Sequence, residues 1–216
     1  MRVVIIGGHG KIALLLARLL SDRGHEVTSA FRDPAHSQEV AATGAHPVVA
    51  DVETMDTAAI AGLLSGHDAV VWSAGAGGGN PERTRAVDRD AAIRSMAAAA
   101  EAGVPRYVMV SYLRSGRDTV TEHDSFFPYA QAKAEADAHL RGTSLAWTIL
   151  GPGRLTAEAG TGTVSAGEDV FRGDVSRANV AELAAQVLQR TDLAGVTVNF
   201  VDGPTPIGQA LDEAAG

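Results

Sequence analysis

The sequence has 216 residues, a formal net charge of −8 at pH 7 and no cysteine. Its length fits one α/β domain with a sizeable core, so we predict a single domain over residues 1–216. The acidic balance and the lack of a long Lys/Arg run argue against nucleic acid or an anionic membrane as partner, and the missing thiols exclude disulfides and thiolate catalysis. Redox chemistry would therefore need a bound cofactor and a small-molecule substrate. We expect a cytoplasmic monomer or homodimer, since the first apolar run is too short to span a bilayer and no signal-type segment precedes it.

Short apolar runs alternate with amphipathic stretches along the whole chain. The predicted strands are Val3–Ile6, Glu26–Phe31, Pro47–Ala50, Ala69–Trp72, Tyr107–Val110, Ala146–Leu150 and Val196–Val201. The predicted helices are Lys11–Ser21, Ala35–Ala42, Met55–Leu64, Glu82–Ala102, Tyr129–Arg141 and Asn179–Gln189. This alternation predicts a doubly wound, Rossmann-type parallel sheet of about seven strands with helices on both faces and a 3-2-1-4-5-6 type of strand order.

Ligands of such sheets bind at the carboxyl ends of the strands, and the two long irregular stretches follow strands. One is the glycine-rich "AGAGGGNPE", and the other runs from Pro152 to Asp174. We expect a small C-terminal substrate lobe, contributed mainly by residues 112–128 and 152–176.

A glycine-rich turn joins the first strand to the first helix in "IIGGHGKIA". The pattern G-x-x-G-x-x-A lets the chain turn sharply and lets the backbone approach a pyrophosphate at the helix N-terminus. An ordinary structural turn is the alternative, but its place at the first strand-to-helix junction favours cofactor binding. The predicted cofactor contacts of this turn are Gly7, Gly8, His9, Gly10, Lys11 and Ile12.

The end of the second strand, "TSAFRDP", bears on the choice of cofactor. An acidic side chain there holds a free ribose 2′-hydroxyl, whereas a guanidinium favours a 2′-phosphate. Arg32 is present, and Asp33 followed by Pro34 is typical of a helix N-cap. We therefore predict NADP(H), with NAD(H) as second choice, although Arg32 could also be an exposed arginine without a ligand.

Three further stretches follow successive strands and fit the same nucleotide. Each also has a plain loop explanation. Asp51 can present its carboxylate to the adenine amine, with Val52 beside it. The small residues Ala74, Gly75 and Ala76 allow backbone approach near the cofactor ribose. After the sixth strand, Pro152 and Gly153 would border the nicotinamide.

Together these stretches and the segments "VMVSY", "PYAQAKAEADAHL" and "WTILGPGRL" resemble an atypical short-chain dehydrogenase/reductase. The resemblance is to NAD(P)H-binding proteins of the NmrA-like and flavin/biliverdin reductase kinds, and it covers nearly the whole chain. It implies a Rossmann fold and a dinucleotide. It leaves the reaction open, because the group includes reductases, isomerases and redox-sensing regulators.

Tyr129 and Lys133 are spaced i, i+4 on a predicted helix, so both side chains lie on one face. The pair resembles the YxxxK pair of short-chain dehydrogenases. A lysine ammonium there, together with the positive charge of the oxidised nicotinamide, would lower the pKa of the phenol towards neutrality, so that Tyr129 passes a proton to or from a substrate oxygen. Lys133 would also hold the nicotinamide ribose. The alternative is a solvated lysine beside a packed tyrosine.

The hydroxyl that usually accompanies this pair is displaced in "VMVSYLRS". Ser111 matches the family position nearer the strand, which touches cofactor more often than substrate, so it is predicted both as a cofactor contact and as a catalytic residue. Tyr112 or Ser115 could replace the missing substrate-orienting hydroxyl.

The seven histidines show no metal-ligand spacing, and we predict no metal site. Two function classes remain. The first is an NADPH-dependent oxidoreductase acting on a small carbonyl, quinone or flavin. The second is a non-catalytic regulator that senses the redox state of the cofactor.

Overall fold

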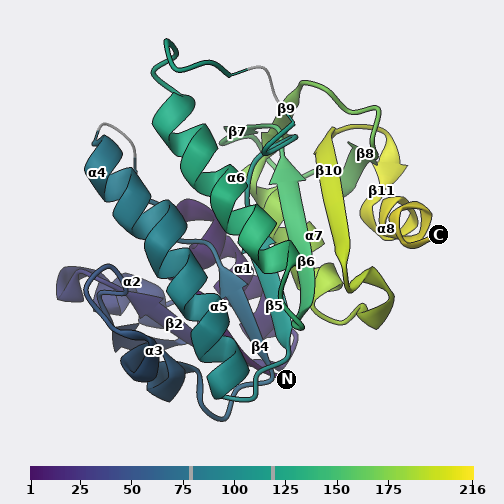
Figure 1. The fold of residues 1–216 in the computed structure, drawn as a ribbon. Coiled ribbons are helices and arrows are strands. Elements are labelled where there is room, and N and C mark those ends of the chain that lie inside the picture. The colour runs from purple at the N-terminus through teal and green to yellow at the C-terminus, as the bar shows by residue number, and fades with distance from the viewer. Residues whose placement is uncertain (78–79, 118–119) are drawn as a thin grey trace.

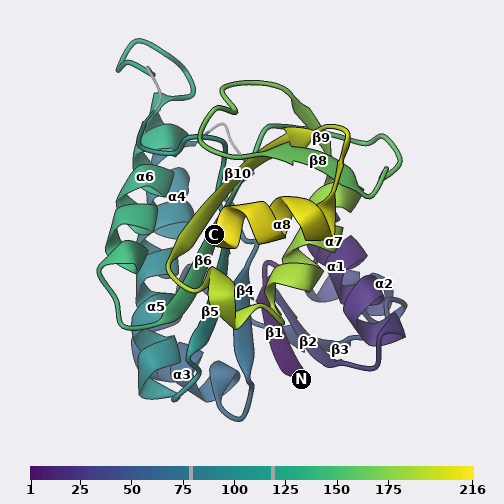
Figure 2. The same cartoon turned by 90° about the vertical axis from the view of Figure 1, so that its right-hand side faces the viewer.

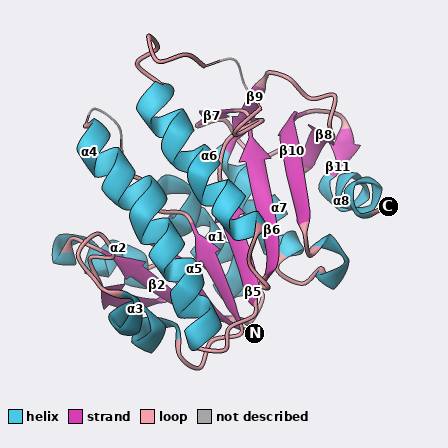
Figure 3. Cartoon of the chain, in the orientation of Figure 1, coloured by secondary structure: helices cyan, strands magenta, loops and turns pink. Residues whose placement is uncertain are grey.

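The computed structural model describes residues 1–77, 80–117 and 120–216, and its centre is a twisted sheet between two layers of helices (Figures 1 and 3). The strands are β1 (Arg2–Ile6), β2 (Glu26–Phe31), β3 (His46–Val49), β4 (Ala69–Trp72), β5 (Arg106–Val110), β6 (Ala146–Pro152), β7 (Arg154–Thr156), β8 (Thr163–Ala166), β9 (Asp174–Ser176), β10 (Val196–Asp202) and β11 (Thr205–Pro206). Nine of them form one sheet in the order β11-β8-β10-β6-β5-β4-β1-β2-β3, and β7 pairs with β9 separately.

The doubly wound parallel sheet predicted from the sequence is confirmed. All seven predicted strands are present and run parallel from β3 to β10, and the 3-2-1-4-5-6 order holds. The sheet has more strands than predicted, because β8 and β11 extend it in antiparallel pairing beyond β10. Strands β7 and β8 and the start of β9 give regular structure to parts of the stretch from Pro152 to Asp174, which we predicted to be irregular.

The helices pack on both faces of this sheet. They are α1 (Lys11–Asp22), α2 (Ser37–Ala41), α3 (Thr57–Leu64), α4 (Pro81–Thr84), α5 (Ala92–Glu101), α6 (Phe127–Arg141), α7 (Arg177–Val187) and α8 (Ile207–Ala215), with short turns at η1 (Pro34–His36), the π-helical η2 (Arg85–Ala91) and η3 (Thr191–Leu193). Alternate residues of β1 divide the core: Val3 and Ile5 join the cluster under α1, α7 and α8, whereas Val4 and Ile6 join the cluster under α3, α5 and α6. Figure 2 shows α1, α7 and α8 on the side turned away from α5 and α6.

Two predicted helices have different boundaries in the structure, because a capping residue or a tight turn begins or interrupts them. The predicted helix Ala35–Ala42 is a 3₁₀ turn followed by the short α2. The predicted helix Glu82–Ala102 begins one residue earlier, at Pro81, because Asn80 caps it, and a π-helical segment separates α4 from α5. The C-terminal α8 was not predicted.

Successive strand ends meet at one edge of the sheet. Ile6 pairs with Trp72, and Trp72 pairs with Met109, so the residues that follow β1, β4 and β5 emerge side by side. Residues 78–79 of the predicted glycine-rich loop and 118–119 of the predicted lobe lie outside the described residues. None of the helices in the described ranges has the length and hydropathy needed to cross a membrane.

Candidate dinucleotide and substrate site

The glycine turn after β1 is held by the neighbouring strand and depends on the absence of side chains. The backbone N–H groups of Gly7 and Gly8 both donate to the carbonyl of Ala30, at 3.0 and 2.8 Å. Gly7 has φ +87°, and a Cβ there would lie 2.5 Å from the backbone of Ala74. A Cβ on Gly8 would lie 2.6 Å from the side chain of Ser29. The first two glycines therefore serve the packing of the turn itself.

The helix that follows this turn offers a place for an anion. Gly10, the N-cap of α1, provides no side-chain hydrogen bond to the helix, and the first turn contains no acidic residue. The free backbone N–H groups and the positive end of the helix dipole suit a pyrophosphate at this position. The residues present thus fit the phosphates of a dinucleotide.

A cavity of about 320 Å³, here called the turn cavity, opens beside the glycine turn. Eight of the predicted cofactor contacts line it: Gly7, His9, Gly10, Arg32, Asp51, Val52, Ala74 and Gly75. They come from the ends of four neighbouring strands, as expected for a nucleotide in the crevice of a doubly wound sheet.

The cationic side of the turn cavity is formed by two arginines around one carboxylate. The Arg32 guanidinium, whose side chain is 55% exposed, lies 3.8 Å from Glu53, and Arg83 lies 3.1 Å from the same carboxylate. Arg83 also donates to the Ala76 carbonyl at 2.6 Å, so it is anchored on two sides. As predicted, Asp33 caps the following turn through Ala35 N.

The sequence analysis did not identify His36, Glu53 and Arg83, which also line the turn cavity. The rings of His9 and His36 stack with centroids 3.5 Å apart, and Glu39 holds His9 at 2.8 Å. Arg83 comes from α4, a segment that no phosphate-binding motif marks. The signal that could have drawn attention to it is the Asn-Pro helix start directly after the glycine-rich loop.

A second cavity of about 630 Å³, here called the aromatic cavity, lies at the ends of β5 and β6. Its lining includes four predicted site residues: Ser111, Tyr129, Pro152 and Gly153. The rings of Tyr112, Phe126 and Tyr129 form a cluster with centroid distances between 5.1 and 5.7 Å. The other lining residues are Leu113, Arg154, Leu155, Arg172, Gly173 and Asp174. That the segments 112–128 and 152–176 form a substrate lobe stays a prediction.

Lys133, which we predicted to hold the nicotinamide ribose, is buried at the end of β5. Its side chain is 1% exposed, and its ammonium donates to the Val110 carbonyl at 2.9 Å. Burial lowers the pKa of Lys133, while the charges of Asp137 and Asp88 counteract that fall. Within the described residues it lines neither the turn cavity nor the aromatic cavity.

The surroundings of Tyr129 shift the pKa of its phenol upwards. Burial raises it above the usual value of a phenol, and the negative charges of Asp88 and Asp137 add to the increase. The charges of Asp137 and Asp88 act on Lys133 as well, where they raise the pKa against the effect of burial. The predicted lowering towards neutrality includes the positive charge of an oxidised nicotinamide, and it stays a prediction. Tyr129 is a neutral hydroxyl that can donate a proton.

Ser111 is hydrogen-bonded to Asp137, one of the buried charged residues around Lys133. It is 5% exposed, and its hydroxyl donates to Asp137 at 2.5 Å. Asp88, on the π-helical turn, accepts a hydrogen bond from Ala76 N at 3.0 Å, and burial raises the pKa of Asp88. Asp88, Lys133 and Asp137, here called the buried triad, thus hold the loops after β4 and β5.

Four further predicted contacts lie outside the lining of both cavities within the described residues. Gly8 is packed against β2, Ile12 belongs to the core under α1, and Lys11 is exposed. Ala76 is buried and contributes its backbone to Asp88 and Arg83.

The glycine turn, the uncapped helix and the two cavities along one sheet edge define a dinucleotide-binding protein of the Rossmann type. Residues 7–191 match the family model described as NAD(P)H-binding. The chain is 36% identical over 213 residues to the "Uncharacterized sugar epimerase YhfK" of Bacillus subtilis, covering 98% of this chain and 99% of that protein. The chain belongs to the NAD(P)H-binding family.

Two solved structures extend this comparison. A putative NAD-dependent epimerase/dehydratase from Bacillus halodurans is 30% identical, with a TM-score of 0.91 and 99% of both chains covered. The anaerobilin reductase ChuY of Escherichia coli O157:H7 has a TM-score of 0.78 at 21% identity, covering 95% of this chain and 100% of that chain, which is a likeness of fold. The resemblance seen in the sequence is confirmed.

Gly10→Val tests the glycine turn as the phosphate site. A Cβ on Gly10 would lie 3.1 Å from the Gly7 carbonyl oxygen, so the turn must shift by a few tenths of an ångström to accept it. The branched side chain would occupy the approach of the pyrophosphate. We expect loss of NADPH binding in calorimetry with the fold retained by circular dichroism. Gly62→Val is the control, because its Cβ has nothing within 4 Å. Unchanged NADPH affinity in Gly10→Val would remove this turn from the site.

Proposed function

We propose that this protein is an NADP(H)-dependent reductase of a small apolar acceptor, a carbonyl compound, quinone or flavin. The observation that carries the proposal is the aromatic cavity, which adjoins the cofactor edge of the sheet and is lined mainly by rings and apolar side chains. Ligand sites of this kind combine apolar walls with a few polar groups that fix orientation. Here Ser111 and Tyr129 are such groups at the end of β5 and on α6, and the charged side chains of Arg154, Arg172 and Asp174 complete the lining.

The bound nicotinamide would supply the hydride. The chain's own residues would bind and orient the two reactants. The turn cavity would hold the adenosine half, with Arg32 near the 2′-phosphate, and the α1 N-terminus would face the pyrophosphate. In the aromatic cavity Tyr129 would donate its phenolic proton to the acceptor oxygen, and the ring cluster would exclude water from that hydrogen bond.

Two other functions are candidates. The names of the relatives point to sugar epimerases, and the sequence analysis left open a redox sensor. The apolar lining of the aromatic cavity supports an apolar acceptor over a sugar. The sensor is favoured because two of the predicted catalytic groups do not offer a proton to the aromatic cavity. Lys133 is buried, and the Ser111 hydroxyl directs its proton to Asp137.

Turnover decides between these functions. Wild-type protein is given NADPH and a panel of carbonyls, quinones, flavins and nucleotide sugars, and NADPH oxidation and sugar interconversion are followed. We expect oxidation with at least one apolar acceptor. NADPH binding without any turnover would support the sensor, and interconversion of a nucleotide sugar would support the epimerase.

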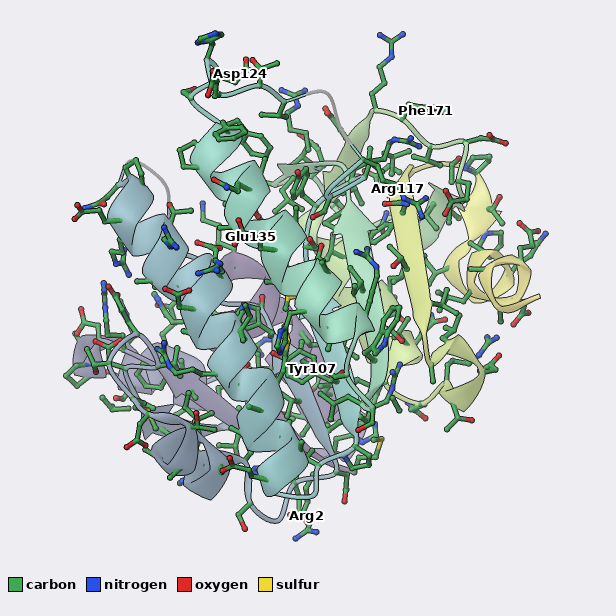
Figure 4. All side chains as sticks on the ribbon, viewed as in Figure 1. Arg2, Tyr107, Arg117, Asp124, Glu135 and Phe171 are labelled. Carbon is green, nitrogen blue, oxygen red and sulfur yellow. The ribbon has the colours of Figure 1, made fainter. Side chains whose placement is uncertain are left out.

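Arg32→Ala tests the choice of cofactor. Loss of a guanidinium from the 2′-phosphate should weaken NADPH binding by about 1.5–3 kcal/mol and leave NADH almost unchanged. Arg2→Ala is a matched control, since Arg2 is also 55% exposed and pairs with Asp68 at 3.8 Å, but lies at the opposite end of the molecule from Asp124 and Phe171 (Figure 4). Equal losses for NADPH and NADH in Arg32→Ala would contradict NADP(H) specificity.

A further inference from the structure

Asp137 determines whether the Ser111 hydroxyl can donate or accept a hydrogen bond in the aromatic cavity. A serine hydroxyl has one proton and two lone pairs, whereas an ionised carboxylate can only accept. Because Ser111 donates to Asp137 at 2.5 Å, its single proton points into the protein. Towards the cavity, which Ser111 lines, only lone pairs remain.

Asp137 makes this orientation hard to reverse. The residue is 0% exposed, and its Oδ1 atom has no hydrogen-bond partner among the described residues. Ser111 therefore gives this carboxylate its hydrogen bond at Oδ2. If the hydroxyl turned its proton to a ligand, a buried carboxylate would lose that bond, which is costly in a low-dielectric interior.

Asp137 is itself fixed by its position on α6. It lies four residues after Lys133 and eight after Tyr129, so the three side chains follow one face of the helix. The Lys133 cation attracts Asp137 and is anchored on the carbonyl of Val110, the residue before Ser111. Helix α6 and the end of β5 are thus connected at two adjacent points.

We propose that Asp137 is a positioning residue that makes Ser111 a hydrogen-bond acceptor for an N–H group of the bound ligand. A carbonyl oxygen at this position would meet lone pairs, so Ser111 does not hold the carbonyl being reduced. The N–H group belongs either to the nicotinamide carboxamide or to the acceptor, such as the N3–H of a flavin. This inference rests on the proposed function.

The test compares cofactors that differ in this one group. The 3-acetylpyridine analogue of NADP replaces the carboxamide nitrogen by a methyl group, so its binding is compared with that of NADP by calorimetry. We expect wild type to bind the analogue about 5- to 15-fold more weakly, as for one hydrogen bond. Ser111→Ala and Asp137→Asn should both reduce this ratio to about 1 to 2. Ser95→Ala, which removes a buried hydroxyl bonded to Tyr107, should leave the ratio unchanged.

A second arm separates the two sources of the N–H group. If wild type does not distinguish the analogue from NADP, KM is measured for riboflavin and for its N3-methyl derivative. A preference for riboflavin that disappears in Ser111→Ala places the N–H on the acceptor and supports the proposal. No dependence on Ser111 in either arm overturns it. Thermal unfolding of each variant verifies folding, and absence of any dinucleotide binding by wild type would instead refute the proposed function.

Discussion

Lys133→Met should lower the free energy of unfolding by about 3–5 kcal/mol, a large part of the stability of a domain of this size. The variant removes the cation of the buried triad and leaves Asp88 and Asp137 without it, at 1% and 0% exposure. It also removes the donor to the Val110 carbonyl. Denaturant unfolding followed by circular dichroism measures the loss.

The loss of stability in Lys133→Met should increase with pH. Burial raises the pKa of Asp88, and the Lys133 charge opposes that rise, so the variant raises this pKa further. A carboxyl whose folded pKa exceeds its unfolded value contributes most stability below about pH 4, and that contribution is lost as pH increases through the folded pKa. Lys133→Met should therefore be more destabilised, relative to wild type, at pH 8 than at pH 5.

Lys11→Met provides the matched control. Lys11 is the other lysine of the sequence and is exposed at the start of α1, so its replacement should change stability by less than about 0.5 kcal/mol. The double variant Lys133→Met/Asp137→Asn should regain part of the loss, because it removes a carboxylate together with its cation. A loss below about 1 kcal/mol in Lys133→Met, or a double variant less stable than the single one, would contradict a stabilising triad.

The parallel sheet could be predicted because each of its strands is a short apolar run bounded by turn residues. Seven such runs became seven parallel strands. Three of the four additional strands, β7, β9 and β11, have only two or three residues, too few for periodicity to show. The fourth, β8, has four residues, of which only Val164 and Ala166 are apolar. Helix α8 is amphipathic, but it follows a proline and lies at the end of the chain, where the alternation of strands and helices no longer indicates the next element.

The candidate site was predictable to the extent that it depends on backbone shape. Glycines at strand ends mark where a nucleotide approaches, and Gly7, Gly10, Ala74 and Gly75 all line the turn cavity. The role of Lys133 was not predictable, because the i, i+4 spacing places it on the face of Tyr129 without saying how deep it lies. Its ammonium is held by the Val110 carbonyl at the end of β5, 23 positions earlier in the chain, and no local pattern reveals that partner.

Tyr129→Phe should reduce turnover on carbonyl acceptors by about 100-fold or more, with NADPH affinity nearly unchanged. The variant keeps the ring in contact with Tyr112 and Phe126 and removes the hydroxyl proposed to protonate the acceptor oxygen. Because the pKa of Tyr129 is raised above its usual value of about 10, the phenol keeps its proton throughout the neutral range. The rate of reduction by wild type should therefore show no decline between about pH 6 and pH 9 that depends on Tyr129.

Two tyrosine variants make this result specific. Tyr107→Phe should retain full activity, since Tyr107 is buried against Ser95 away from both cavities. Tyr112→Phe tests the neighbouring hydroxyl of the aromatic cavity, and a large loss there with little loss in Tyr129→Phe would assign the proton donor to Tyr112. Activity on quinones or flavins that survives Tyr129→Phe would keep the reductase and take the proton from solvent. Ser111 directs its proton to Asp137, so among the described lining residues of the aromatic cavity Tyr129 and Tyr112 are the two hydroxyls left to donate to the acceptor oxygen. Loss of activity in both Tyr129→Phe and Tyr112→Phe would therefore mean that both phenols are needed at that oxygen.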